Sequence, residues 1–124
     1  MSKKIFTSLG LMSGTSMDGV DASIIQSDGI TEFELISNEY CEFDQDLFQK
    51  LIELRDKLFS SKDLDQNLKH INEIEINFTL FISKFVNSLI EKNSLTFDLI
   101  GFHGQTILHL RKEKISKQLA GGHI

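Results

Sequence analysis

Two short segments of the chain carry residue types that could do chemistry. The first is the run Leu-Gly-Leu-Met-Ser-Gly-Thr-Ser-Met-Asp-Gly-Val-Asp over residues 9–21. A phosphate group needs inward-pointing backbone N–H groups, hydroxyl donors and a backbone that can approach closely. Gly14 and Gly19 permit tight turns and close approach, and the hydroxyl residues between them add donors. The segment therefore predicts a phosphate-binding turn.

Two carboxylates near the end of this run suit a divalent metal ion. Asp18 and Asp21 offer hard oxygen ligands for a Mg²⁺ ion that bridges phosphates, directly or through water. Mg²⁺ takes only one or two protein carboxylates and keeps several waters, so this supply is sufficient. On the residues alone, either carboxylate could serve as the metal ligand.

Two better-known motifs do not fit the same run. The phosphate loop G-x-x-x-x-G-K-[ST] has the spacing of Gly14 and Gly19, but Val20 and Asp21 stand where lysine and a hydroxyl residue belong. The nucleophile elbow G-x-S-x-G needs a second glycine where Asp18 stands. A plain hairpin loop, rich in turn-forming residues, stays open as the alternative.

The second segment is Asp-Leu-Ile-Gly-Phe-His-Gly-Gln-Thr-Ile over residues 98–107. Its polar residues follow a short apolar run that reads as a buried strand, and ligands favour the carboxyl ends of such strands. His103, Gln105 and Thr106 supply donors and acceptors suited to sugar hydroxyls and amides, and Gly104 lets the backbone bend. Taken alone, a histidine here is more often structural.

Hydrophobic periodicity predicts the elements that position these segments. Alternation predicts an antiparallel meander of strands, and Asp28-Gly29 predicts a two-residue hairpin turn. Apolar steps of three and four then predict two helices, the first with Asp44 as its N-cap. A strand that follows a helix is usually parallel to an earlier one. The expected elements are strands at 5–12, 20–26, 30–43, 97–102 and 106–110 and helices at 45–59 and 64–92, with a break at 60–62. The order predicts an α/β fold, a mixed β-sheet with packed helices.

Composition narrows the classes of function. The chain has 124 residues, enough for one domain, and a net charge of −5 with scattered basic residues, which argues against a nucleic-acid partner. No apolar run reaches the ~18 residues of a membrane span. The single cysteine, Cys41, suits a reducing cytoplasm and reads as a small buried hydrophobe.

The two segments, in this order, resemble the anhydro-N-acetylmuramic acid kinase family. That family is similar in fold to the actin, hexokinase and Hsp70 superfamily. The resemblance runs from about Phe6 to Leu110, and it implies that residues 1–124 are the amino-terminal, nucleotide-binding domain of an actin-like, ribonuclease H-like ATPase, truncated before its carboxy-terminal domain. The implied contacts to ATP phosphates and Mg²⁺ are Gly14, Thr15, Ser16, Met17, Asp18, Gly19, Val20 and Asp21. In the chemistry that the resemblance implies, Asp18 helps to hold the metal, and Asp21 orients the turn or shares the water shell of the metal. The implied sugar-binding residues are His103, Gly104, Gln105 and Thr106.

The activity implied by the resemblance is phosphoryl transfer from ATP coupled to hydrolytic opening of 1,6-anhydro-N-acetylmuramic acid, a small amino sugar of cell-wall recycling. The product is N-acetylmuramic acid 6-phosphate. The general base of the family lies in a later portion, so no catalytic residue is assigned here. We expect a truncated or split kinase, with a separately encoded carboxy-terminal half, or a non-catalytic remnant. The family also looks dimeric, which makes a homodimer an expectation.

Overall fold

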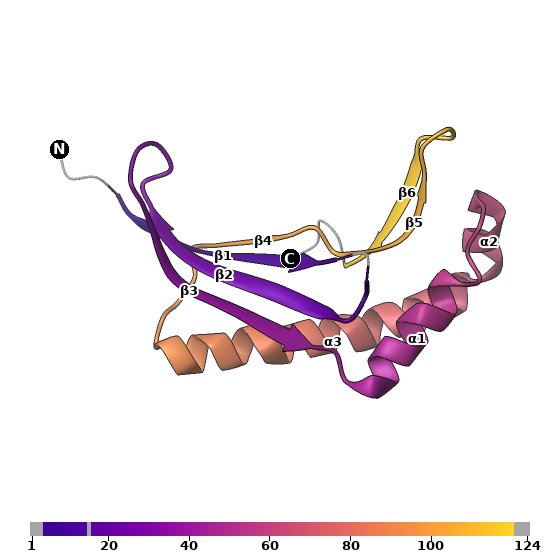
Figure 1. Ribbon diagram of the computed structural model, residues 1–124, viewed down its shortest axis with the longest axis horizontal. Coiled ribbons are helices and arrows are strands. Elements are labelled where there is room, and N and C mark those ends of the chain that lie inside the picture. The colour runs from indigo at the N-terminus through magenta and orange to yellow at the C-terminus, as the bar shows by residue number, and fades with distance from the viewer. Residues whose placement is uncertain (1–3, 15, 121–124) are drawn as a thin grey trace.

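The computed structural model describes residues 4–14 and 16–120. It is an α/β fold in which a mixed sheet packs on helices, as the sequence predicts (Figure 1). The elements are β1 (Phe6–Ser13), β2 (Gly19–Ser27), β3 (Phe33–Glu42), α1 (Gln45–Arg55), α2 (Ser61–Gln66), α3 (Leu68–Asn93), β4 (Leu99–Phe102), β5 (Gln105–Leu110) and β6 (Ile115–Leu119).

The main sheet has the strand order β3-β2-β1-β4. Strands β1, β2 and β3 form the antiparallel meander that alternation predicts. Strand β4 follows the long helix and pairs in parallel with β1, so the expected parallel strand is confirmed. Strands β5 and β6 form a separate antiparallel hairpin. This arrangement brings the ends of β1 and β4 side by side.

The core lies between one face of the main sheet and α3. Figure 1 shows α3 and α1 on the same side of this sheet. Alternate residues of β1 and β2, such as Leu9 and Ile24, are buried against α3. The buried stripe of α3 includes Phe78 and Ile82. Leu68, at the first turn of the helix, is exposed.

The helix boundaries differ from the predicted ones. Asp44 is the N-cap of α1, and its Oδ1 accepts from the Leu47 backbone N–H at 2.8 Å. The predicted break at 60–62 is wrong, because a short helix, α2, begins at Ser61. Its cause is a capping box in which Ser60 and Asp63 satisfy each other's backbone N–H groups. The predicted helix at 64–92 is therefore two helices, parted at Asn67.

The β2–β3 connection is longer than a two-residue turn. Ser27 pairs with Phe33, so residues 28–32 form the loop. Asp28 Oδ1 accepts from the backbone N–H groups of Ile30, Thr31 and Glu32, each at 2.9 Å. This side-chain bonding supports a wider loop than Asp-Gly alone suggests. None of the helices in the described parts of the chain is long and apolar enough to cross a membrane.

Candidate phosphate site

The predicted phosphate turn connects β1 to β2. The turn is closed by the Met17 backbone N–H, which donates to the Gly14 carbonyl oxygen at 3.2 Å. A side chain on Gly14 would meet only the Ser16 hydroxyl, at 3.9 Å, so the backbone there is open to a ligand. Met17 has a φ of 58°, a left-handed conformation that is rare for residues other than glycine. Its buried side chain anchors the turn in the core.

Asp18 is exposed at the end of the turn and is held by two hydroxyl groups. The Ser16 hydroxyl donates to its Oδ1 at 2.8 Å. Ser16, then Tyr40, lowers the pKa of the Asp18 carboxyl by hydrogen bonding to its charged form. The Asp18 backbone carbonyl also accepts from the Phe43 N–H at 2.9 Å. A fixed, ionised carboxylate thus stands beside the turn.

Tyr40 is a site residue that the sequence analysis missed. It lies on β3, opposite Asp21 of β2 in the strand register. The Tyr40 phenol packs against the Gly19 backbone: a Cβ built on Gly19 would lie 2.4 Å from the Tyr40 Oη. Burial raises the pKa of Tyr40, and the hydrogen bond to Asp18 raises it further. No signal in the sequence reveals this contact, because it depends on a register that shifts at Ile24/Ile25.

Gln105 joins the second segment to the turn. Its side chain is fully buried at the start of β5. The amide nitrogen donates to the Gly14 carbonyl oxygen at 3.1 Å and to the Thr106 carbonyl oxygen at 3.2 Å. The Ser13 hydroxyl donates to the amide oxygen. Gln105 was predicted to contact the sugar, but its buried side chain makes its hydrogen bonds to protein atoms.

The remaining predicted residues fall into two groups. Ser16, Asp18 and Asp21 are exposed polar residues at the turn, and His103, between β4 and β5, is exposed as well. By contrast, the Val20 side chain is fully buried in the core, so only its backbone lies at the turn. Gly104 is buried with a φ of 88°, a conformation that favours glycine. Thr106 is half-buried on β5, and Thr15 lies outside the described residues.

The carboxylates of the site fit a metal that is bound mainly through phosphates. The described residues contain no group of three or more His, Cys, Asp or Glu side chains placed to hold a metal ion by themselves. Mg²⁺ in phosphoryl-transfer sites needs only one or two carboxylates, because phosphate oxygens and water complete its octahedron. The exposed Asp18, with Asp21 nearby on β2, matches that requirement.

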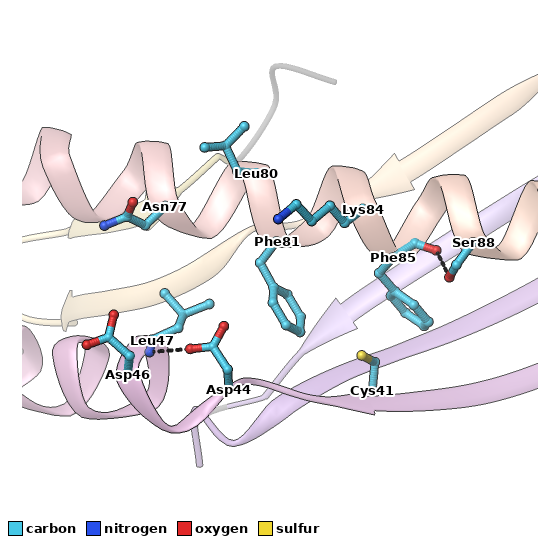
Figure 2. Close-up of a pocket in the computed structure, with 10 residues that line it drawn as sticks. All are labelled: Cys41, Asp44, Asp46, Leu47, Asn77, Leu80, Phe81, Lys84, Phe85 and Ser88. Atoms are coloured by element: carbon cyan, nitrogen blue, oxygen red, sulfur yellow. Dashed lines mark hydrogen bonds between the residues drawn. The ribbon is translucent and has the colours of Figure 1, made fainter.

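A cavity of about 510 Å³ lies elsewhere, between α3 and the segment that joins β3 to α1 (Figure 2). Phe81 and Phe85 of α3 face Cys41 and Asp44 across it, and none of the predicted site residues lines it. Burial, followed by the charge of Glu42, raises the pKa of the Cys41 thiol. A thiol that stays protonated is a poor nucleophile. Cys41 is half-buried at the wall of this cavity, and not fully buried as predicted.

The class that the fold defines is an α/β protein with a mixed sheet and packed helices, in which a hairpin turn carrying glycine, hydroxyl and carboxylate groups is bonded to the start of β5. Comparison with known proteins identifies the family. The family profile described as Anhydro-N-acetylmuramic acid kinase matches residues 6–123. The chain therefore belongs to the anhydro-N-acetylmuramic acid kinase family, and the family predicted from the two segments is confirmed.

Relatives bearing the name anhydro-N-acetylmuramic acid kinase match almost the whole chain. The protein of Pelagibacter ubique (strain HTCC1062) is 52% identical over 122 residues, which cover 98% of this chain and 32% of the relative. The protein of Rhizobium johnstonii is 34% identical over 121 residues, covering 95% of this chain and 32% of the relative. The chain thus spans about a third of the length of these relatives.

Proposed function

We propose that this chain supplies the Mg·ATP phosphate site of a kinase that acts on 1,6-anhydro-N-acetylmuramic acid. The observation that carries the proposal is the Gln105 amide bonded to Gly14, which places the second segment directly against the phosphate turn. A sugar held near His103 would then lie close to the phosphates. The names of the relatives support this choice of substrate.

Each part of the turn has a separate task in this proposal. The open backbone at Gly14 approaches the phosphates, and Ser16 adds a hydroxyl donor. Gly19 is covered by Tyr40, so its part is to let β2 and β3 lie close together at the end of the turn. Thr15 belongs to the same set by sequence. Asp18 holds the metal, and Asp21 orients the turn or shares the water shell of the metal. Mg²⁺, when bound with ATP, neutralises charge on the transferred phosphoryl group. Met17 and Val20 act through their backbones, because their side chains are buried.

The sugar side of the site is formed by the second segment. His103 is exposed and Thr106 half-buried, so both can reach a ligand, whereas Gly104 and Gln105 shape the backbone behind them. In the proposed reaction water attacks the anomeric carbon, the bond from that carbon to O6 breaks, and O6 receives the γ-phosphoryl group of ATP. This chain binds and orients the reactants. The general base is proposed to lie in the later portion of the kinase.

The test incubates purified chain with Mg·ATP and the anhydro sugar, alone and with the carboxy-terminal portion of the Pelagibacter relative, and measures the 6-phosphate product. We expect product only with both portions. Calorimetry with Mg·ATP tests the turn separately, with Asp18→Ala as the comparison. If Asp18→Ala bound Mg·ATP with unchanged affinity, Asp18 would not be a metal ligand.

A non-catalytic binding role is the alternative to this proposal. Absence of product both alone and with the added carboxy-terminal portion would favour it. We also propose a cytoplasmic location, a homodimer and a separately encoded carboxy-terminal half. Size-exclusion chromatography with light scattering tests the homodimer directly.

A further inference from the structure

The cavity between α3 and the segment that joins β3 to α1 has the volume of a small-molecule site, about 510 Å³. Its apolar wall consists of Leu47 from α1 and of Leu80, Phe81 and Phe85 from α3. Figure 2 shows both phenylalanine rings pointing from α3 toward Asp44. None of the described residues of the phosphate turn lines this cavity, so it is a separate place in the molecule.

The apolar wall is anchored to the core. The Phe81 ring meets the Phe43 ring edge-on at 5.2 Å between centroids, a preferred geometry for aromatic pairs. Phe43 in turn meets Phe78, which is fully buried, at 5.7 Å. Leu47 is also buried. The wall is therefore preformed, and its rings are held in place beside the cavity.

A carboxylate stands on the α1 side of the cavity. Asp44 is the N-cap of α1, and its Oδ1 accepts from the Leu47 backbone N–H at 2.8 Å. Figure 2 shows this bond and the Asp44 carboxylate directed toward α3. Its Oδ2 has no hydrogen-bond partner among the described residues. The neighbouring Asp46 already pairs with Lys50, at 2.9 Å. Asp44 is thus a fixed acceptor with one oxygen left for a ligand.

A lysine stands on the α3 side of the same cavity. Lys84 lines the cavity, is exposed, and forms no ion pair within the part of the chain that the structure describes. In Figure 2 the Phe81 ring lies between Lys84 and Asp44. Asn77, two turns earlier on α3, adds an amide to the lining. The cavity therefore combines charges of both signs with an apolar surface between them.

This combination excludes several classes of ligand. A polyanion such as a nucleotide would face the carboxylates of Asp44 and Asp46. An organic cation would be repelled by Lys84. A neutral apolar molecule would desolvate both charges without giving either a partner, which is costly. A zwitterion with an apolar side chain satisfies the carboxylate, the ammonium and the aromatic wall together.

We propose that this cavity binds a free apolar α-amino acid in its zwitterionic form. The ligand ammonium donates to Oδ2 of Asp44, and the ligand carboxylate accepts from Nζ of Lys84. The apolar side chain of the ligand packs on Phe81 and Phe85. The inference goes beyond the proposed function and does not rest on it, because the cavity shares no described residue with the phosphate turn.

The test titrates the isotope-labelled chain with L-leucine and with L-phenylalanine and follows the backbone amide signals by NMR. We expect saturable shifts at residues 44–47 and 77–88, which line the cavity. Two analogues of leucine each lack one charge: 4-methylpentanoate has no ammonium, and 3-methylbutylamine has no carboxylate. Each should bind at least about tenfold more weakly than leucine, because charge-assisted hydrogen bonds are the strong ones.

Three variants test the residues. Asp44→Asn removes the charge and keeps the cap, because asparagine is an equally good N-cap residue. Lys84→Gln removes the cation. Each should weaken leucine binding at least about tenfold. Lys69→Gln is the matched control, since Lys69 is an exposed lysine on α3 outside the cavity, and it should bind as wild type does. Circular dichroism checks that all three fold.

The proposal is overturned if neither amino acid gives saturable shifts, or if the shifts lie away from the cavity. It is also overturned if either analogue binds as tightly as leucine, if Asp44→Asn or Lys84→Gln binds as wild type does, or if Lys69→Gln loses binding equally. No kinase reaction enters this measurement, so its failure leaves the proposed function standing, and the failure of the proposed function leaves this result unchanged.

Discussion

The Gln105 amide nitrogen donates to the Gly14 carbonyl oxygen at 3.1 Å, across 91 residues of sequence. Ser13, the last residue of β1, donates to the oxygen of the same amide. The start of the phosphate turn is therefore held by a buried side chain from β5. Because buried polar groups are costly when left unpaired, this amide couples the order of the turn to the docking of the β5–β6 hairpin.

Gln105→Ala should destabilise the chain by about 1–3 kcal/mol, because it removes the hydrogen bonds that the buried amide makes with the Gly14 carbonyl and the Ser13 hydroxyl. Urea unfolding followed by circular dichroism measures the change. Gln49→Ala is the control: Gln49 is exposed on α1, so its loss should change the free energy of unfolding by less than about 0.5 kcal/mol. Equal stabilities of the two variants would contradict a structural role for the Gln105 amide.

Tyr40→Phe should weaken the Mg²⁺-dependent part of ATP binding by about tenfold, because residues that orient a metal ligand affect metal affinity by this order. The phenyl ring still packs on Gly19, so only the hydrogen bond to Asp18 is lost. Calorimetry with and without Mg²⁺ separates the two contributions. Ser23→Ala removes another hydroxyl from the same face, and its binding should equal wild type. A Tyr40→Phe titration identical to wild type would refute the role.

Gly19→Ala should lower stability by about 1–3 kcal/mol through overpacking. The new Cβ would lie 2.4 Å from the Tyr40 Oη and 2.5 Å from the Cys41 carbonyl oxygen. Since one obstacle is backbone, Gly19→Ala combined with Tyr40→Ala should recover only part of the loss. Gly101→Ala, which meets nothing within 4 Å, should be near neutral in the same thermal unfolding assay. A neutral Gly19→Ala would show that the strands separate more easily than the structure implies.

The strands could be predicted from local alternation of apolar residues, and the N-cap at Asp44 from its side chain. The parallel pairing of β4 could be predicted because β4 follows a long helix. It did not reveal the Tyr40 contact or the burial of Gln105. Both depend on tertiary geometry: one on the register of β2 with β3, the other on a side chain reaching the far end of β1.

Two further errors in predicting the fold have local causes that are visible in the sequence. Ser60 and Asp63 form the S-x-x-D pattern of a capping box, which marks the start of α2 within the predicted break. Asp28 can accept several backbone hydrogen bonds, so Asp-Gly at the end of β2 does not require a two-residue turn. In both places a polar side chain that bonds nearby backbone decided the outcome.

Asp28 should make the stability of the chain depend on acid. Backbone N–H groups of the loop, that of Glu32 first, lower its pKa from 3.8 to about 2. Because the pKa is lower in the folded chain than in the unfolded chain, the ionised Asp28 carboxylate stabilises the folded state. This stabilisation is present above about pH 4 and is lost as the pH falls toward 2. Asp28→Asn should therefore flatten the decline in urea midpoint over this range.

The control for the acid prediction is Asp65→Asn, since Asp65 is an exposed carboxylate on α2 away from the loop. Its urea midpoints should decline with acid as those of the wild type do. If Asp28→Asn followed the same curve as wild type between pH 4 and pH 2, the loop hydrogen bonds would not be coupled to folding.

Phe78→Ala should be among the most damaging core substitutions, costing about 3–5 kcal/mol. The ring is fully buried, meets Phe43 edge-on at 5.7 Å between centroids and stacks with Phe102 at 5.9 Å. Phe59→Ala, at an exposed phenylalanine, should change stability by less than about 0.5 kcal/mol. Because Phe102 directly precedes His103, Phe78→Ala should also loosen the second segment, seen as faster amide exchange at Gly104 and Gln105. Unchanged exchange there would show that β4 is held by its pairing with β1 alone.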